Sequence, residues 1–240
     1  MAYPERIVPD ETGSGIVAIH LKRYDFARPH CRDRDVLDAA CGVGYGTARL
    51  AEVARHVVGV DLSEDAIAYA RRRYPAPNVA YRVADLLDLD LPDASFDVAC
   101  SFETIEHLPD QQAFLRHVVR VLRPDGTLFV STPRAHETNR SPENPFHCVE
   151  LSRDDFEALL RRFFGEVEIY GQRRLQTTRH RVMQRLDVLE LRKRLGFLRS
   201  ASVFLGTQPM AEVTADGLAI DRKDLGRATE LVAVCRRPQR

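Results

Sequence analysis

The segment Asp38-Ala-Ala-Cys-Gly-Val-Gly-Tyr-Gly46 decides how this chain folds, because it joins an apolar run to a segment of helical spacing. The run Val36-Leu-Asp-Ala-Ala40 has the composition of a buried strand, and residues 47–54 have helical periodicity. Gly42 and Gly44 have no Cβ and would let a ligand approach the backbone closely. Parallel sheets bind ligands where a strand ends and a helix begins, although an ordinary tight turn has the same composition.

Beyond this segment, short β-rich runs alternate with helix-period segments, which predicts an α/β fold with a doubly wound, mostly parallel sheet. The expected strands are residues 36–40, 57–61, 79–83, 96–102, 127–131, 167–170 and 231–235. The expected helices are residues 47–54, 63–74, 110–122 and 152–163. Ser63 is a good helix start because its hydroxyl can accept hydrogen bonds from unpaired amides. Arg123-Pro-Asp-Gly126 predicts a turn before the fifth strand.

With 240 residues and 44% hydrophobic composition, the chain is expected to form one domain. Its expected parts are an N-terminal helical segment, a cofactor-binding core, a helical insertion or lid, and a last strand with a tail, at residues 1–34, 35–171, 172–226 and 227–240. Nine of the residues from Gln172 to Arg199 are basic, against Asp187 and Glu190, with apolar residues at helical spacing. This pattern fits a solvated lid helix, and it also fits a cap that recognises an anionic acceptor or RNA.

The charges balance, with 35 basic and 35 acidic residues, so no global field favours nucleic acid or a membrane surface. No run approaches the roughly 18 apolar residues of a membrane span, and the start of the chain lacks the pattern of a secretion signal. We therefore expect a cytoplasmic protein. The five cysteines are odd in number and show no Cys-x-x-Cys spacing, which predicts free thiols.

Acidic residues follow successive strands of the predicted sheet. Asp61 ends the second strand, where a carboxylate can accept both hydroxyls of a ribose. Asp85, with Leu86, follows the third strand and can meet an adenine edge, and Phe102 and Glu103 end the fourth. Each acid alone could be a solvated loop residue. Their joint placement at the carboxyl ends of neighbouring strands predicts a site for a nucleoside-containing cofactor.

Together these segments resemble the class I S-adenosylmethionine-dependent methyltransferases over roughly residues 24–170 and again at the last strand. The resemblance rests on Val36-Leu-Asp-Ala-Ala-Cys-Gly-Val-Gly44, Val57-Val-Gly-Val-Asp61, Ala84-Asp85, Phe96-Asp-Val-Ala99 and Val121-Leu-Arg-Pro-Asp-Gly126. It implies a Rossmann-like sheet of seven strands, the last antiparallel, and S-adenosyl-L-methionine as the cofactor. A nicotinamide-dependent oxidoreductase fits less well, because Thr47 stands where its third glycine is needed.

The resemblance also implies roles for individual residues. Asp38, Gly42 and Gly44 would line the methionine part of the cofactor, Asp61 would hold the ribose, Leu62 would pack on adenine, Asp85 would take the adenine amine, and Leu86 and Phe102 would complete the site. Ala40 stands where the family commonly has glycine, and alanine still permits close packing. On the preceding segment, Arg23 and Tyr24 could close over the cofactor, although core packing suits Tyr24 equally well. His20 is expected on the surface.

The segment Glu103-Thr-Ile-Glu106-His107 carries the candidate chemistry of the acceptor side. On a helical turn, positions 103, 106 and 107 share one face. An imidazole can accept a proton at neutral pH, so His107 with Glu106 is a candidate general base, and a base favours an oxygen acceptor. The simpler interpretation is that Glu106 and His107 cap or solvate the start of a helix.

Adding His147 creates a candidate metal site. Glu103, Glu106, His107 and His147 could together hold Mg, Mn or Zn, although His147 could also only pin its loop. The pattern resembles the metal site of the terminal 2'-O-methyltransferases of small RNAs, and part of it resembles quinone-biosynthesis O-methyltransferases.

These observations favour a methyltransferase that acts on a hydroxyl of a small acceptor, either a sugar or glycoside or a phenol, and the basic segment is compatible with an anionic one. Ser131-Thr-Pro133 and Asn144-Pro-Phe-His147 also resemble segments of methyltransferases associated with glycan assembly. The alternatives are an RNA-end 2'-O-methyltransferase, an N-methyltransferase of a small metabolite, and a non-catalytic cofactor-binding regulatory protein. A nucleic-acid partner is not expected, because the net charge is zero and no RNA-binding domain is evident. A homodimer remains an open expectation.

Overall fold

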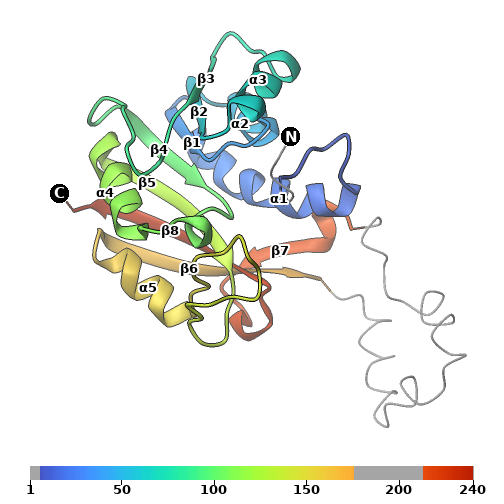
Figure 1. Cartoon of the computed structure of the whole chain (residues 1–240), viewed down its shortest axis with the longest axis vertical. Coiled ribbons are helices and arrows are strands. Elements are labelled where there is room, and N and C mark those ends of the chain that lie inside the picture. The colour runs from blue at the N-terminus through green and yellow to red at the C-terminus, as the bar shows by residue number, and fades with distance from the viewer. Residues whose placement is uncertain (1–5, 176–212, 240) are drawn as a thin grey trace, which may run out of the picture.

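A single mixed sheet with helices on both faces forms the centre of the molecule (Figure 1). The computed structural model describes residues 6–175 and 213–239. Within these residues the sheet has eight strands in the order β3-β2-β1-β4-β5-β8-β6-β7. Their bounds are β1 Asp35–Ala39, β2 His56–Asp61, β3 Val79–Val83, β4 Phe96–Ser101, β5 Leu122–Pro133, β6 Phe164–Arg174, β7 Leu218–Asp221 and β8 Glu230–Pro238.

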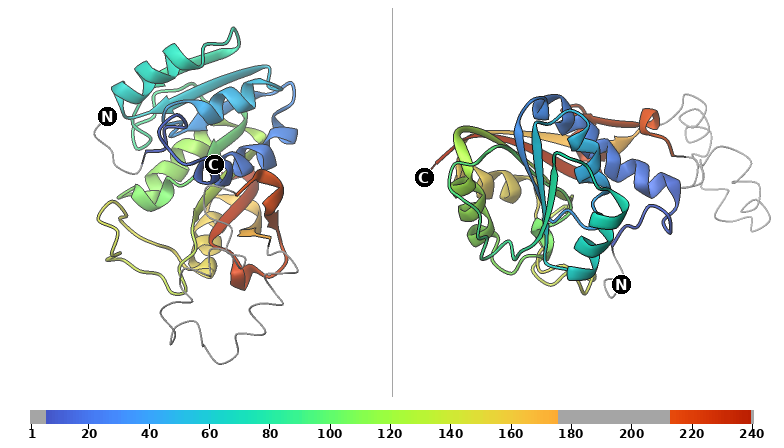
Figure 2. Two further views of the ribbon diagram at one scale, coloured as in Figure 1. Left: turned by 90° about the vertical axis from the view of Figure 1, so that its right-hand side faces the viewer. Right: turned by 90° about the horizontal axis from the view of Figure 1, so that it is seen from above.

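Five α-helices in the described residues cover this sheet (Figure 2). They are α1 Ser14–Ala27, α2 Tyr45–Ala51, α3 Glu64–Arg73, α4 Gln111–Val121 and α5 Arg153–Arg161. Alternate residues of β1 point to opposite faces: Val36 packs with Leu50 of α2, whereas Leu37 packs with Phe114 of α4 and Phe156 of α5. The helices α1 and α2 therefore cover one face, and α4 and α5 cover the other.

The predicted fold class is confirmed. The strands β1, β2, β3, β4 and β5 pair in parallel, and the last strand, β8, is antiparallel to β5. The expected number of strands was wrong, because the sheet has eight strands and not seven. The additional strand β7 pairs with the end of β6, from Gly171–Asp221 to Arg174–Leu218.

The expected helical insertion, residues 172–226, therefore includes the end of β6 and the whole of β7. The strand β6 continues to Arg174, and β7 is only four residues long. A four-residue edge strand has too few residues to show a clear periodicity, which explains why the sequence pattern did not indicate it. Most of the basic segment from Gln172 to Arg199 lies outside the described residues.

The starts of three helices follow local sequence signals. The side chains of Ser63, Asp110 and Ser152 accept hydrogen bonds from the backbone N–H groups of Ala66, Ala113 and Asp155. The helix predicted from Ser63 is thereby confirmed. The turn predicted at residues 123–126 was wrong, because these residues lie within β5. They coincide with a shift in strand register: Leu122 pairs with Phe96, and the next pair is Thr127 with Val98.

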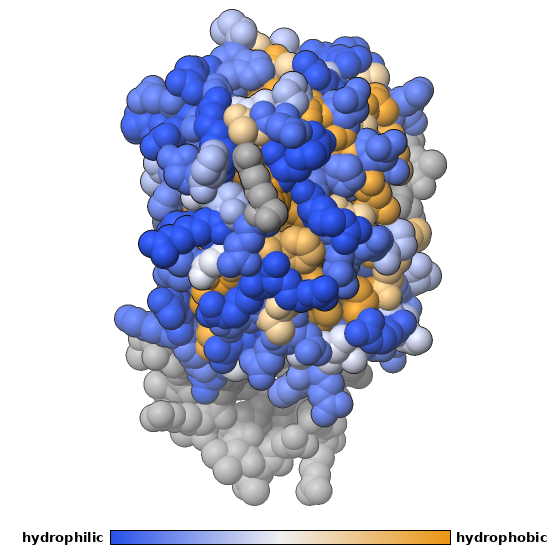
Figure 3. All heavy atoms as spheres, turned by 90° about the vertical axis from the view of Figure 1, so that its left-hand side faces the viewer, coloured by the Kyte–Doolittle hydropathy of each residue, from blue (hydrophilic) through white to orange (hydrophobic). Residues whose placement is uncertain are grey.

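The described helices include none that is long and apolar enough to cross a membrane. On the face of the molecule in Figure 3, hydrophilic side chains predominate and hydrophobic ones gather in bands between them. All five cysteines are free, as expected from their spacing.

Ala40 lies just after β1 with a φ of 66°, in the left-handed region. The expectation that alanine is harmless there, because it permits close packing, leaves out this backbone strain, which costs an L-residue about 1–2 kcal/mol. We predict that Ala40→Gly raises the free energy of unfolding by about 0.5–1 kcal/mol, after the greater freedom of glycine in the unfolded chain is subtracted. Urea denaturation measures this value, and Ala39→Gly, within β1, should destabilise instead.

Candidate active site

A cavity of about 590 Å³ opens at the carboxyl ends of β1, β2 and β4. Most of the predicted site residues line it: Ala40, Gly42, Asp61, Leu62, Asp85, Leu86, Phe102, Glu103, Glu106, His107 and His147. Residues that the sequence patterns did not indicate also line it: Arg6, Ile7, Cys41, Tyr45, Ser63, Thr104, Leu108 and Pro133. The strand order explains this convergence, because neighbouring parallel strands end at one edge of the sheet.

Gly42 and Gly44 both have left-handed backbone angles, with φ of 55° and 87°, but their surroundings differ. Nothing lies within 4 Å of the place where a Cβ of Gly42 would stand, and this residue lines the cavity. A Cβ on Gly44 would lie 2.7 Å from Cβ of Ala70 in α3. The expected cofactor role of Gly44 is therefore corrected: this glycine permits the close packing of α3 against the turn.

Asp38 is also corrected, because its carboxylate is fully buried beneath the turn and does not line the cavity. It accepts hydrogen bonds from Tyr24 Oη at 3.2 Å and from Thr47 Oγ1 at 2.6 Å. Burial is the main cause that raises the pKa of Asp38 to about 7. In this structure Asp38 ties α1 and α2 to the end of β1.

The raised pKa of Asp38 predicts a pH dependence of stability. Between the unfolded pKa of about 3.9 and the folded pKa of about 7, the folded state holds one more proton than the unfolded state. The free energy of unfolding should therefore decrease as pH rises through this window, by at most about 1.4 kcal/mol per pH unit for this group. Urea denaturation between pH 4.5 and 8 should show a shallower decrease for Asp38→Asn. Parallel pH profiles for the two proteins would contradict the assignment.

The carboxylate of Asp61 closes the glycine-rich turn against the start of α3. Its Oδ2 accepts the N–H of Gly42 at 2.9 Å, and its Oδ1 accepts the N–H of Ser63 at 2.9 Å. Arg6 Nη2 lies 3.7 Å from Oδ1. Beside this acid, Leu62 is 70% exposed although it is apolar. A flat apolar ligand group on Leu62 would remove this surface from water.

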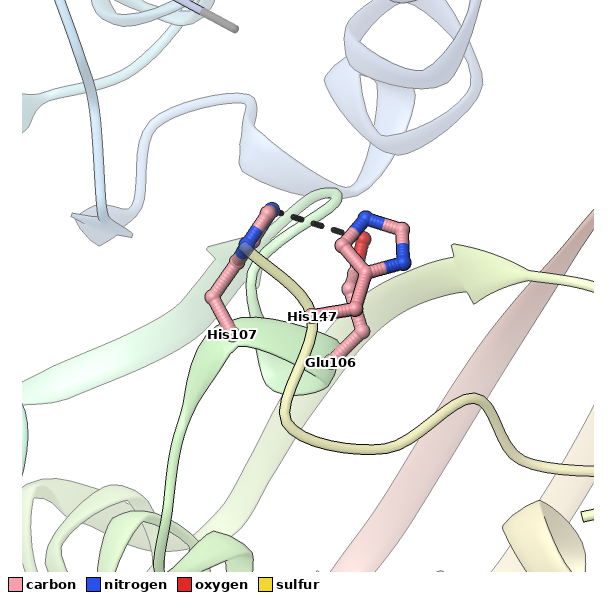
Figure 4. A group of neighbouring side chains, drawn as sticks. All are labelled: Glu106, His107 and His147. Atoms are coloured by element: carbon pink, nitrogen blue, oxygen red, sulfur yellow. Dashed lines mark ion pairs between the residues drawn. The ribbon is translucent and has the colours of Figure 1, made fainter. Parts of the chain in front are cut away.

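At the other end of the cavity, Glu106, His107 and His147 converge (Figure 4). One potential metal-ligating atom from each residue lies within 4.8 Å of the others. His107 Nε2 is 4.0 Å from Glu106 Oε1, and the centroids of the two imidazole rings are 4.8 Å apart. Glu106 is 1% exposed, and its Oε2 has no hydrogen-bond partner. Burial, followed by the nearby charge of Glu103, raises the pKa of Glu106 well above its usual range.

Hydrogen bonds orient both imidazoles of this cluster. His107 Nδ1 lies 2.9 Å from the carbonyl oxygen of Phe146, which can only accept, so Nδ1 carries a proton and, in the neutral ring, Nε2 carries the lone pair. His147 Nδ1 lies 2.7 Å from Glu150 Oε1. The backbone N–H groups of Cys148 and Val149 donate to the carbonyl oxygen of Glu106. The loop after β5 is thereby fastened to the turn that carries Glu106 and His107.

Glu103 does not join these three residues, which corrects the expected set of four metal ligands. The helical turn begins only at Ile105, and Glu103 precedes it with a left-handed φ of 51°. The assumed helical spacing therefore does not apply. Glu103 Oε1 accepts the hydroxyl of Ser131 at 2.6 Å, and Oε2 lies 3.7 Å from Arg23 Nη2. Glu103 still lines the cavity, so it can contact a ligand there.

Residues of α1 form one wall of the cavity. Tyr24 lines it and also packs edge-on against Phe102, with ring centroids 4.9 Å apart, so its core packing is confirmed and its contact with a cofactor stays a prediction. Arg23 is 1% exposed and donates from Nη1 to Gln172 Oε1. His20, which was expected on the surface, is only partly exposed and lines the cavity. Burial, followed by the charge of Arg23, lowers the pKa of His20 to about 2, so this imidazole is neutral.

Known proteins with similar sequences and structures agree with this geometry. Residues 37–130 match the family described as a methyltransferase domain. A probable S-adenosylmethionine-dependent methyltransferase of Mycobacterium tuberculosis is 45% identical over 160 residues, which are 65% of this chain and 58% of that protein. A ubiquinone biosynthesis O-methyltransferase of Neisseria meningitidis is 33% identical over 136 residues, which are 53% of this chain and 54% of that protein. The chain thus spans little more than half the length of these relatives.

The fold agrees as well. The crystal structure of an S-adenosylmethionine dependent methyltransferase from Mesorhizobium loti superposes with a TM-score of 0.60 at 20% identity, over 93% of this chain and all of that one. At this identity the likeness concerns the fold alone. The domain match carries the assignment further, since residues 37–130 include the glycine-rich turn and Asp61. On this evidence residues 37–130 match a methyltransferase domain, and the chain is similar to S-adenosylmethionine-dependent methyltransferases over this core.

Proposed function

We propose that this chain binds S-adenosylmethionine in the cavity and transfers its methyl group to a hydroxyl of a small molecule, either a sugar or glycoside or a phenol. The observation that carries the proposal is the cluster of Glu106, His107 and His147 at the end of the cavity away from Asp61. Methyl transfer to a neutral amine needs no base, whereas a hydroxyl attacks better as its proton leaves. The related ubiquinone biosynthesis O-methyltransferase supports an oxygen acceptor.

The opposite end of the cavity suits the adenosine half of the cofactor. Asp61 would accept the ribose hydroxyls, and Asp85 would accept the adenine amine. Leu62 and Leu86 supply the apolar contact for adenine. The methionine part would then run past Ala40 and Gly42 toward Phe102, and the sulfonium methyl would point toward the cluster.

The proposed step is an in-line displacement. The bond between sulfur and the methyl carbon breaks as the bond between the acceptor oxygen and that carbon forms, and S-adenosylhomocysteine leaves. The proton of the hydroxyl passes to Nε2 of His107, which carries the lone pair because Nδ1 donates to the carbonyl of Phe146. Alignment can supply most of the acceleration, because the sulfonium is already activated.

A divalent ion would fit the same cluster. The buried Oε2 of Glu106 has no hydrogen-bond partner, and two imidazoles stand beside it, a donor set that suits zinc or manganese. The residues that would hold the ion are Glu106, His107 and His147. Bound there, it would occupy the lone pair of His107 Nε2 and take the place of the base, because it would anchor the acceptor hydroxyl and lower its pKa.

Incubation with methyl-labelled S-adenosylmethionine and separate pools of glycosides, phenols, amines and short RNAs tests the proposal. Label in a glycoside or phenol product supports it. Label confined to amines would favour an N-methyltransferase, and label confined to RNA would favour an RNA-end 2'-O-methyltransferase. Failure to bind the cofactor would contradict all three.

We predict that His107→Ala lowers kcat by about 100-fold or more, because the hydroxyl loses its proton acceptor, while the affinity for S-adenosylhomocysteine stays unchanged. His136→Ala is the matched control, since His136 is exposed on the loop after β5. An undiminished rate in His107→Ala would remove this residue from the mechanism. For the metal, we expect chelation to abolish activity and Zn²⁺ or Mn²⁺ to restore it. Activity that survives both chelation and His147→Ala would leave the cluster without a metal.

A further inference from the structure

The residues just before α1 form a compact turn over the glycine-rich segment. In this N-terminal strap, residues 6–12, the backbone N–H groups of Glu11 and Thr12 both donate to the carbonyl of Val8. The N–H of Val8 donates in turn to Thr12 Oγ1 at 3.3 Å. These bonds give the strap a defined shape of its own.

Val8 anchors the strap to two elements of the cofactor site. Its side chain is 5% exposed and packs with Val43 of the glycine-rich turn and Ala66 of α3, both fully buried. Asp10 adds a polar contact, because Tyr69 Oη donates to its Oδ2 at 3.1 Å. Burial of a valine side chain contributes more than this exposed hydrogen bond. The strap is thus fastened chiefly by Val8.

The strap presents Arg6 and Ile7 to the cavity. The side chain of Arg6 is only 12% exposed, which is unusual for an arginine, and its guanidinium lies 3.7 Å from Asp61 Oδ1. Asp61 is the acid that we assign to the ribose. We propose that the strap is part of the cofactor site, with Arg6 positioning the Asp61 carboxylate and Ile7 covering the adenosine half. This inference rests on the proposed function, since it concerns the same cofactor.

The place of the strap predicts which part of the cofactor it affects. Arg6 lies beside Asp61 at the end of β2, whereas Glu106 and His107 follow β4, and β1 lies between these two strands in the sheet. Loss of the strap should therefore weaken the binding of adenosine and of S-adenosylhomocysteine by the same factor, because both ligands contain the adenosine half.

Isothermal titration calorimetry with adenosine and with S-adenosylhomocysteine tests this inference on four proteins. They are the wild type, Val8→Asp, Arg6→Gln and the control Glu11→Gln, whose side chain is exposed on the same turn. Val8→Asp places a charge against Val43 and Ala66, which should release the strap. We expect about tenfold weaker binding of both ligands to Val8→Asp, about threefold weaker binding to Arg6→Gln, and unchanged binding to Glu11→Gln. Thermal melting shows whether each variant is folded. If Val8→Asp does not fold, Arg6→Gln still tests the inference, because it keeps the Val8 anchor.

Trypsin cleavage after Arg6 gives a second measurement that does not depend on activity. Saturating adenosine should slow this cleavage in the wild type and have a much smaller effect in Val8→Asp. Equal affinities of the wild type, Val8→Asp and Arg6→Gln for adenosine would overturn the inference and leave the proposed function intact. A wild type that binds neither ligand would overturn the proposed function as well. Weaker binding of S-adenosylhomocysteine with unchanged binding of adenosine would also overturn the inference, because the strap would then contact the methionine half.

Discussion

Replacing Asp61 by alanine will lower the affinity for S-adenosylhomocysteine by at least about 100-fold. A hydrogen bond to a charged group contributes about 1.5–3 kcal/mol, and Asp61 is proposed to accept two from the ribose. Each 1.4 kcal/mol corresponds to a factor of ten in the dissociation constant. The variant also leaves the N–H groups of Gly42 and Ser63 without their acceptor, so the turn loses part of its order. Calorimetric titration measures the affinity directly.

Two further variants test whether the loss of affinity is caused by removal of the Asp61 carboxylate. Asp61→Asn keeps the shape and one acceptor oxygen, so its affinity should lie between those of the wild type and Asp61→Ala. Asp88→Ala removes an exposed acid near the cavity and should bind normally. A loss below tenfold in Asp61→Ala would mean that another group holds the ribose.

Gly46→Ala will lower the free energy of unfolding by about 3 kcal/mol, at the upper end of what overpacking usually costs. A Cβ at position 46 would lie 1.9 Å from Cζ of Tyr24 and 2.3 Å from its Cε1 and Cε2. The ring cannot move aside easily, because Phe102 packs against it and its hydroxyl donates to Asp38. Urea denaturation measures the change. Binding of S-adenosylhomocysteine should weaken as well, since Tyr24 lines the cavity.

Gly13→Ala is the matched control for this substitution, because nothing lies within 4 Å of a Cβ at position 13. The double variant Tyr24→Ala with Gly46→Ala should be more stable than the sum of the two single effects predicts, since each change relieves the cost of the other. A loss below 1 kcal/mol in Gly46→Ala, or additive effects in the double variant, would show that the ring of Tyr24 is not fixed against α2.

Local signals were sufficient for much of this molecule. The caps at Ser63, Asp110 and Ser152 depend on a side chain and an amide three residues away, so the sequence shows both partners. The parallel strands were predictable because their apolar runs are long enough to show a pattern. The joint placement of Asp61 and Asp85 at one cavity followed from a general rule, that neighbouring parallel strands end at the same edge of a sheet.

Other features depend on contacts or angles that no short stretch of sequence reveals. The burial of Asp38 comes from Tyr24 and Thr47, which lie on different helices. Glu103 turns to Ser131 and Arg23 because its backbone is left-handed, and this angle removes it from the helical spacing that its distance from Glu106 and His107 suggested. The strand β7 exists through its pairing with β6, whose residues lie 44 to 50 positions earlier in the chain, from the pair Arg174–Leu218 to the pair Gly171–Asp221.

The sequence by itself thus determined the fold class, the turn at residues 38–46 and the edge of the sheet where a cofactor would bind, because periodicity and strand order act over short distances. Only the tertiary structure decided which of the predicted residues face the cavity. It placed Gly42 there and Gly44 against Ala70, kept His20 neutral in the wall, and folded Arg6 onto Asp61. These outcomes depend on packing between segments far apart in the chain, where a single backbone angle or one buried neighbour determines the direction of a side chain.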